Sequence, residues 1–259
     1  MVIFEKLIKQ MKIIKRTVFF AILLAAIINT NTSFSQLRLL IGPVIGYTSP
    51  SGDYGGSTTD FYSGIKYGLG ASVNYGAEAK LTLGPLNGKL SISYVSMSNS
   101  GTANSNQPNS TVDVKNSIFT VGIGTEFGFA IPFSPVRPYA GVDFLISTIN
   151  GSFQFQNTPT VSNQNSNDVK SASRTGLGFN LGAEYKAGKT ITLDFSLHYN
   201  MINLFGKKYD GVEGNRINAY TSLNDGTDNL YDAGNVNHPI GSNRSIAVIQ
   251  IQLGILFGL

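Results

Sequence analysis

LGASVNYGAEAKLTLGPLNGKLSISY, residues 69–94, alternates in polarity along almost its whole length. Every second residue from Leu69 to Leu83 is apolar, and the positions between them hold small, polar or charged residues. A period of two over this length predicts an extended strand, because an amphipathic helix repeats its apolar residues about every 3.6 positions. Residues 84–88 predict a turn, and a second alternating stretch follows. The segment therefore predicts a β-hairpin.

The hairpin pattern recurs twice along the chain. Strand, turn and strand fall at residues 119–129, 132–138 and 140–146, and again at residues 177–185, 186–189 and 191–199. Single alternating segments at 37–47 and 244–259 flank the hairpins, so that eight strands are expected. The connections between these units are long and polar, at residues 48–66, 98–115, 151–173 and 206–243. Short turns at one end and long loops at the other are typical of transmembrane β-barrels.

The composition restricts the class of protein. Charged residues make up 13% of the 259 residues, about half of the roughly 25% that soluble domains carry. The absence of cysteine excludes a disulfide scaffold, a cysteine metal site, a cysteine nucleophile and a lipoprotein anchor. The net charge of +4 comes from the first 35 residues, and the remainder is balanced. A nucleic-acid partner is therefore not expected, because nucleic-acid-binding proteins keep a basic face.

The first 35 residues predict an extension followed by a cleaved secretory signal peptide. Met11 is the expected start, basic residues follow it, and Val18 to Ile28 form an uninterrupted apolar run. Ser33 and Ser35 place small residues before a cut that would release a chain starting at Gln36. An N-terminal membrane anchor is the alternative, but eleven helical residues span only about 17 Å of a hydrocarbon core of about 30 Å. The expected division is residues 1–35 for the leader and 36–259 for the barrel.

Two kinds of eight-stranded barrel fit the alternation, a soluble lipocalin-type barrel and a membrane barrel. The apolar face here is bulky and nearly continuous, whereas the other face is rich in Gly, Ser and Thr with a few charges. A lipocalin would show a greasy cavity and a charged exterior. The sequence therefore predicts an all-β fold, an eight-stranded antiparallel up-and-down transmembrane β-barrel with short periplasmic turns and four long extracellular loops.

The chain ends in the strand QLGILFGL, residues 252–259. Its polar, glycine, aromatic and terminal hydrophobic positions match the C-terminal assembly signal of outer-membrane proteins, and they are occupied by Gln252, Gly254, Phe257 and Leu259. With the other features, this ending makes the chain resemble the small outer-membrane β-barrel superfamily, the group of the OmpA transmembrane domain and OmpX. Leu259 departs from the phenylalanine that the family often has at the last position.

The resemblance implies a location and partners. The expected location is the outer membrane of a Gram-negative-type bacterium, reached through the signal peptide. Outer-membrane lipid would surround the barrel, the barrel-assembly machinery would bind the C-terminal strand, and an extracellular ligand of unknown identity would meet the loops. No periplasmic domain follows the barrel, so binding to peptidoglycan is not expected.

Charged residues on the polar face are expected to gather inside the barrel near the short turns. The predicted lumen network, structural or gating in role, consists of Arg38, Glu78, Lys80, Glu126, Asp143, Glu184, Lys186, Asp194 and His198. Buried charges are expensive unless they are paired, and an eight-stranded interior is just wide enough for side chains to fill it. The sequence therefore favours a salt-bridged plug, with an ion path or gate as the alternative.

The predicted function is non-enzymatic: a structural or surface-binding role carried by the extracellular loops. A lipid-modifying enzyme of the same fold and a small channel are the alternatives. His198 shares its face with Ser196 and Asn200, but this face points inward, away from lipid. Oxygen-rich loop residues could bind calcium, yet Asp225, Asp228 and Asp232 lack EF-hand spacing and predict a solvated loop. No cofactor and no metal are predicted.

Overall fold

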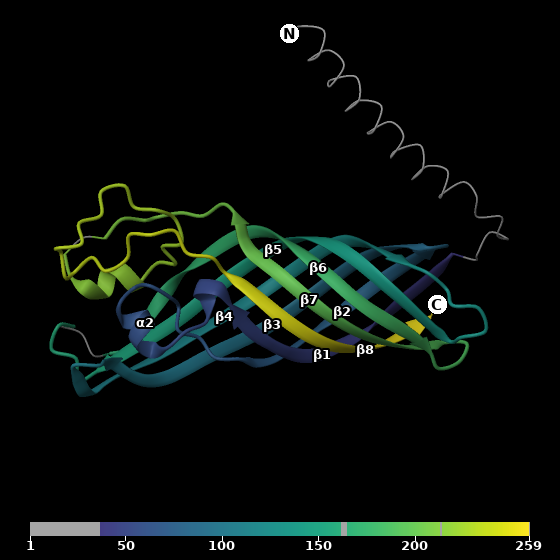
Figure 1. Cartoon of the computed structure of the whole chain (residues 1–259), viewed down its shortest axis with the longest axis horizontal. Helices are drawn as coiled ribbons and strands as arrows, with labels where there is room; N and C mark the ends of the chain where they lie inside the picture. The colour runs from purple at the N-terminus through teal and green to yellow at the C-terminus, as the bar shows by residue number, and fades with distance from the viewer. Residues whose placement is uncertain (1–36, 162–164, 213, 259) are drawn as a thin grey trace, which may run out of the picture. The chain divides into compact units, whose positions relative to one another are not determined.

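The computed structural model describes residues 37–161, 165–212 and 214–258, and these form a closed antiparallel barrel of eight strands (Figure 1). The strands are β1 Arg38–Ser51, β2 Ser72–Leu83, β3 Leu86–Asn104, β4 Gln107–Gly128, β5 Val136–Gln156, β6 Asn167–Lys186, β7 Ile191–Phe205 and β8 Ala247–Gly258. Each strand pairs with the next, and β1 pairs with β8 to close the barrel, for example Ile45 opposite Leu253. The predicted fold class is confirmed. The predicted leader lies outside the described residues.

The first hairpin turn is tighter than predicted. Leu83 pairs directly with Leu86, so that only Gly84 and Pro85 connect β2 to β3. Gly84 has a φ of +65°, a left-handed conformation that glycine adopts without a steric penalty. Asn87, which the sequence pattern assigned to the turn, is a buried strand residue instead.

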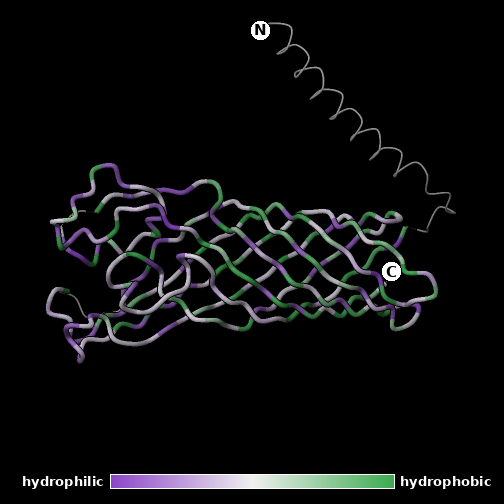
Figure 2. Tube along the Cα trace, in the orientation of Figure 1, coloured by the Kyte–Doolittle hydropathy of each residue, from purple (hydrophilic) through white to green (hydrophobic). Residues whose placement is uncertain are grey.

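The outward face of the barrel is apolar. On β4 the outward side chains of Phe119, Ile123 and Phe127 are each about half exposed, and Phe129 follows directly after the strand. From Phe119 to Phe129 is ten residue steps, or about 33 Å along the chain and about 25 Å once the usual strand tilt of about 40° is included. That height matches the apolar band of outer-membrane barrels. Figure 2 shows apolar and polar residues alternating along the strands, and many polar residues in the long connections.

The segment 98–115, predicted as an irregular loop, is a continuation of the β3–β4 hairpin. Ser98 pairs with Lys115, and pairing continues to Asn104 opposite Gln107. Above Phe119 the outward residues are polar, whereas the inward Val112, Val114 and Ile118 are buried. The alternation persists but its polarity reverses, because the strands have left the apolar band and now enclose an apolar interior. The prediction of a loop was wrong because these strands carry their apolar residues on the inner face, not on the outer face.

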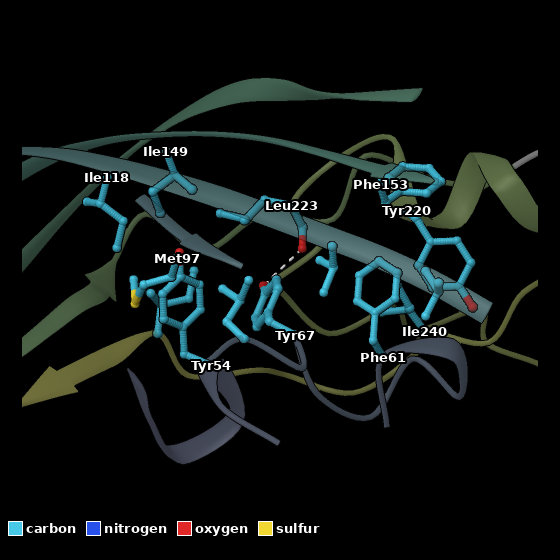
Figure 3. Packing of buried hydrophobic residues seen from close by; sticks show 14 of the residues in the cluster. Tyr54, Phe61, Tyr67, Met97, Ile118, Ile149, Phe153, Tyr220, Leu223 and Ile240 are labelled. Carbon is cyan, nitrogen blue, oxygen red and sulfur yellow. Dashed lines mark hydrogen bonds between the residues drawn. The ribbon is translucent and has the colours of Figure 1, made fainter. Parts of the chain in front are cut away.

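The interior of the loop end is a hydrophobic core. Loop 1 (residues 52–71) carries the 3-10 helix η1 Gly52–Tyr54 and the short helix α2 Thr58–Tyr62, and loop 4 (residues 206–246) carries η2 Arg216–Tyr220. Side chains from both loops pack on the inner faces of β4 and β5 (Figure 3). α2 begins with a capping box in which Ser57 and Asp60 bond each other's backbone N–H groups. None of the helices in the described residues is long and apolar enough to span a membrane.

The C-terminal strand lies at the closing seam of the barrel. The side chain of Gln252 is buried, whereas Phe257 points outward and is 48% exposed. A Cβ added to Gly254 would lie 3.1 Å from Val44 and 3.4 Å from Asp194, so that a larger residue there would crowd the interior. Leu259 lies outside the described residues. The role of this strand in assembly stays a prediction.

Candidate functional site

Charged side chains fill the interior at the turn end of the barrel. We call this group the Lys80 cluster, and it comprises Glu78, Lys80, Asn87, Lys89, Glu126, Arg137, Tyr139, Asp143, Asn180, Glu184 and Asp194. All of these side chains are buried, because the inward positions of neighbouring strands converge in a narrow lumen. Six of the nine residues predicted for the lumen network are among them. His198 lies deeper in the barrel.

Lys80 occupies the centre of the cluster and is completely buried. Its Nζ lies 2.6 Å from Asp194 Oδ2 and 3.0 Å from Glu126 Oε2. The carboxylates of Glu78 and Glu184 follow at 3.4 and 3.5 Å. Nζ also stands 4.1 Å from the ring centroid of Tyr139, whose hydroxyl donates to Asp194 Oδ1 at 2.7 Å. One ammonium group thus joins carboxylates from β2, β4, β6 and β7.

Two cations of the cluster were missing from the predicted network. Lys89 Nζ lies 2.8 Å from Asp143 Oδ2, and the Arg137 guanidinium donates to Glu184 Oε2 at 3.2 Å. Lys89 is the register partner of Lys80 and lies on the polar face of the hairpin, a signal that was available in the sequence. Arg137 fell within the predicted turn 132–138, but β5 begins at Val136 and turns the Arg137 side chain inward.

Two predicted members of the network lie elsewhere. Lys186 is exposed at the last residue of β6. Arg38 is half-buried at the first residue of β1 and donates to the Lys189 carbonyl at 3.3 Å and to Thr192 Oγ1 at 3.4 Å. Long side chains at the barrel rim reach water or neighbouring turns, so alternation alone places them wrongly.

The charges of the Lys80 cluster do not balance. Five carboxylates face three cations, which leaves an excess of two negative charges when every group is ionised. Amide and phenol donors lower part of this cost: Asn87 Nδ2 lies 3.2 Å from Glu126 Oε2, and Asn180 Nδ2 lies 2.9 Å from Asp143 Oδ2. Removing any one of the three cations would therefore raise the excess to three negative charges.

A small polar cavity lies next to the Lys80 cluster. His198, Asn200, Gln250 and Gln252 line part of it. His198 Nε2 is 2.8 Å from Ser196 Oγ, and Asn200 donates to Gln250, which donates in turn to Thr48. The cavity volume is about 20 Å³, room for about one water molecule. An acyl chain or an acylated sugar does not fit there.

The loop end of the interior is closed by the hydrophobic core. Tyr54, Phe155 and Met97 are fully buried, and the rings of Phe61, Phe153, Phe155 and Tyr220 pack against one another with centroids 5.0–6.1 Å apart. Burial raises the pKa of Tyr54, Tyr67 and Tyr220 above its ordinary value. Tyr67 still satisfies its hydroxyl by donating to the Leu223 carbonyl at 2.9 Å (Figure 3). This core joins loop 1 to loop 4.

Ion pairs and hydrogen bonds fasten loop 4 to the barrel wall. Both oxygens of Asp225 accept from the Arg174 guanidinium, at 2.8 and 2.7 Å, and Asn203 donates to the same carboxylate. Arg244 covers the ring of Tyr67 at 4.0 Å. Burial alone would raise the pKa of Asp225, but the hydrogen bonds from Arg174, the Lys208 backbone N–H and Asn203 outweigh it and lower the pKa.

The structure separates the three loop acids that were considered for calcium. Asp225 is buried and bound by Arg174, Asp228 faces His238, and Asp232 is exposed. Within the described residues, no group of three His, Asp or Glu side chains is arranged to hold a metal ion.

Loop 4 is expected to loosen in acid. A lowered pKa in the folded state means that Asp225 stabilises the loop above its ordinary pKa of about 3.9 and stops doing so as the pH falls through the folded value. Asp225→Asn should make the loss visible at neutral pH, reducing the opening free energy of loop 4 by about 2–3 kcal/mol. Hydrogen exchange of the loop 4 amides measures it. The exposed Asp210→Asn is the control, and equal protection in both variants would contradict the expectation.

Comparison with known proteins gives a family match. The model of the family described as "Outer membrane protein beta-barrel domain" matches residues 18–224. Among solved structures, Neisserial surface protein A (NspA) is 14% identical with a TM-score of 0.41 over 87% of this chain and 99% of its own. Ail of Yersinia pestis, solved with the heparin analogue sucrose octasulfate, is 12% identical with a TM-score of 0.41 over 87% and 100%. The N-terminal barrel domain of Pseudomonas aeruginosa OprF is 9% identical with a TM-score of 0.37 over 86% and 97%. No curated protein matches.

Proposed function

Because the chain belongs to the outer membrane protein beta-barrel family, we propose that it is a closed, non-enzymatic barrel of the outer membrane that presents an ordered loop platform to the outside. The observation that carries the proposal is the filling of the interior at two levels. Lys80 is completely buried near the short turns, and Tyr54 and Met97 are completely buried near the loops. An interior that is packed both by the Lys80 cluster and by the hydrophobic core holds the barrel and its loops rigid.

A non-enzymatic role is supported by the position of the Ser–His pair on β7. Ser196 and His198 are buried in the lumen beside a cavity of about 20 Å³. Lipid-modifying chemistry needs its nucleophile and base at the lipid-facing surface, where the acyl groups lie. Envelope lipids analysed by mass spectrometry with and without the protein should therefore be identical, and a changed acyl pattern would overturn this part of the proposal.

A surface role is supported by the order of loops 1 and 4. Aromatic packing and the hydrogen bonds of Arg216 and Tyr220 to the Tyr62 carbonyl hold the two loops together, and the Arg174–Asp225 ion pair fastens loop 4 to β6. A rigid platform binds a partner with less loss of conformational entropy than flexible loops do. The proposed partners are outer-membrane lipid around the barrel, the assembly machinery at the C-terminal strand, and an extracellular ligand at the loops. A cleaved signal peptide would deliver the chain.

The barrel is expected to be silent in planar bilayers. Both levels of the interior are packed, so the wild-type protein should show no steady current at neutral pH. Glu126→Ala should leave the recordings silent or add only brief leaks, because it opens a small hole without clearing the aromatic core. A steady, ion-selective wild-type current that Glu126→Ala abolishes would instead make the Lys80 cluster a conduction path.

A further inference from the structure

Three side chains of loop 4 bring metal-binding atoms together away from the lumen. His238 Nε2 lies 3.0 Å from Asp228 Oδ2, and Tyr209 Oη contacts the same nitrogen. The side chains of His238 and Asp228 are 13% and 9% exposed. The three residues come from separate stretches of the loop, so their convergence is a product of its folded shape.

The backbone of loop 4 sets this arrangement. Gly226 N–H donates to the Lys208 carbonyl at 2.9 Å. This hydrogen bond brings the loop segment just before Tyr209 alongside the loop segment just before Asp228. A Cβ on Gly226 would lie 2.8 Å from the carbonyl carbon of Lys208, so only glycine permits this approach. Asp228 N–H then donates to the Gly241 carbonyl at 3.0 Å and ties the third stretch, which carries His238, to the first two.

The carboxylate of Asp228 is held in place and faces the other two side chains. Asp228 Oδ1 accepts from the Leu230 N–H at 2.9 Å and fixes the orientation of the carboxylate. Oδ2 is buried and lies 3.0 Å from His238 Nε2, and the Tyr209 side chain interacts with the same carboxylate. Two ligands bound to one metal ion at about 2.1 Å lie about 3 Å apart, so the spacing of Asp228 and His238 is that of neighbouring ligands. A cation bound by all three groups would replace the contacts that they make with one another.

We propose that Tyr209, Asp228 and His238 form a binding site for a first-row transition-metal ion in loop 4. Imidazole nitrogen suits Zn²⁺, Cu²⁺ and iron, and carboxylate and phenolate oxygens complete a mixed N/O set. A tyrosine in the set favours ions that are strong enough Lewis acids to displace its proton. Three protein ligands leave further coordination positions for water or for an outside ligand. The site goes beyond the proposed function, because it does not depend on whether the barrel conducts or is an enzyme.

Untagged, folded protein in detergent should bind one equivalent of Zn²⁺ or Cu²⁺ by calorimetry after treatment with a chelator. His238→Gln should weaken binding by roughly 100-fold or more, since even partners outside the coordination shell contribute about 10–100-fold. Tyr209→Phe keeps the ring that stacks on His238 but removes the oxygen, and it should abolish the visible charge-transfer band that Fe³⁺ gives with a phenolate. Ca²⁺ and Mg²⁺, which prefer oxygen-only sites, should not compete.

Two control variants make the test specific. Asp232→Asn changes an exposed acid of the same loop, and His198→Gln removes the other histidine of the chain, so both should keep wild-type binding. A shift in gel mobility on boiling checks that each variant is folded. Absence of stoichiometric binding for Zn²⁺, Cu²⁺ and Fe³⁺ would overturn the proposal, and so would binding that survives both His238→Gln and Tyr209→Phe.

Discussion

Replacing Lys80 by methionine is expected to cost the barrel at least about 3–5 kcal/mol of stability, the usual penalty for removing one partner of a buried ion pair. Methionine fills most of the volume of lysine, so that the loss reports charge and not a cavity. Four carboxylates within 3.5 Å of Nζ would then face one another without their shared cation. Urea unfolding of the detergent-folded barrel, monitored by circular dichroism or by gel mobility, measures the difference.

Two further variants show whether charge is the cause. Lys189→Met changes an exposed lysine in the turn after β6 and should be close to neutral. Asp194→Asn in the Lys80→Met background removes one of the stranded charges and should restore part of the lost stability. If Lys80→Met alone unfolds at the wild-type urea concentration, the cluster is not paired as the distances indicate.

Placing lysine at Phe127, on the outward face of β4, is expected to produce the second large effect. Phe127 points outward within the apolar band and is 56% exposed. A lysine there would bring charge against lipid at a cost of roughly 2–4 kcal/mol near the midplane and less toward the interfaces. Unfolding measured from lipid vesicles should show this loss.

Phe133 supplies the matched control for Phe127. It is also an exposed phenylalanine, but it lies in the turn between β4 and β5, beyond the strands. Phe133→Lys should leave stability in vesicles almost unchanged. Equal losses for the two substitutions would mean that the outward face of β4 does not meet lipid.

Period-two alternation was sufficient to predict the eight strands and the inward position of the acids. Glu78, Glu126 and Glu184 each lie at an inward position near a short turn, and the pattern places them there whatever their partners are. Partners were harder to predict, since the position of the Arg137 side chain depends on where β5 begins and that of Lys186 on where β6 ends. A shift of one or two residues in the position of a strand end decides whether each of these side chains joins the Lys80 cluster.

The loop end was the least predictable part of the molecule from sequence. Residues 98–115 alternate in polarity, but the apolar members point inward, opposite to the strands below. The packing of Phe61 on Phe153 and Phe155 joins residues about ninety positions apart, and no local pattern indicates such pairs. The convergence of Tyr209, Asp228 and His238 likewise depends on the folded path of loop 4.

The reversal of polarity at Ile118 and Phe119 also fixes how deeply the barrel sits. Sliding by one strand repeat of two residues corresponds to about 5 Å along the membrane normal. An inward slide of that size would begin to submerge the outward Ser117 and Lys115, and an outward slide would expose apolar side chains to water. Hydrophobic mismatch costs a fraction of a kcal/mol per ångström. Because the eight strands are joined in one barrel, they must move together, and the whole barrel resists displacement along the membrane normal. The barrel therefore selects bilayers whose hydrocarbon layer is close to 25 Å thick, and thicker ones must thin around it.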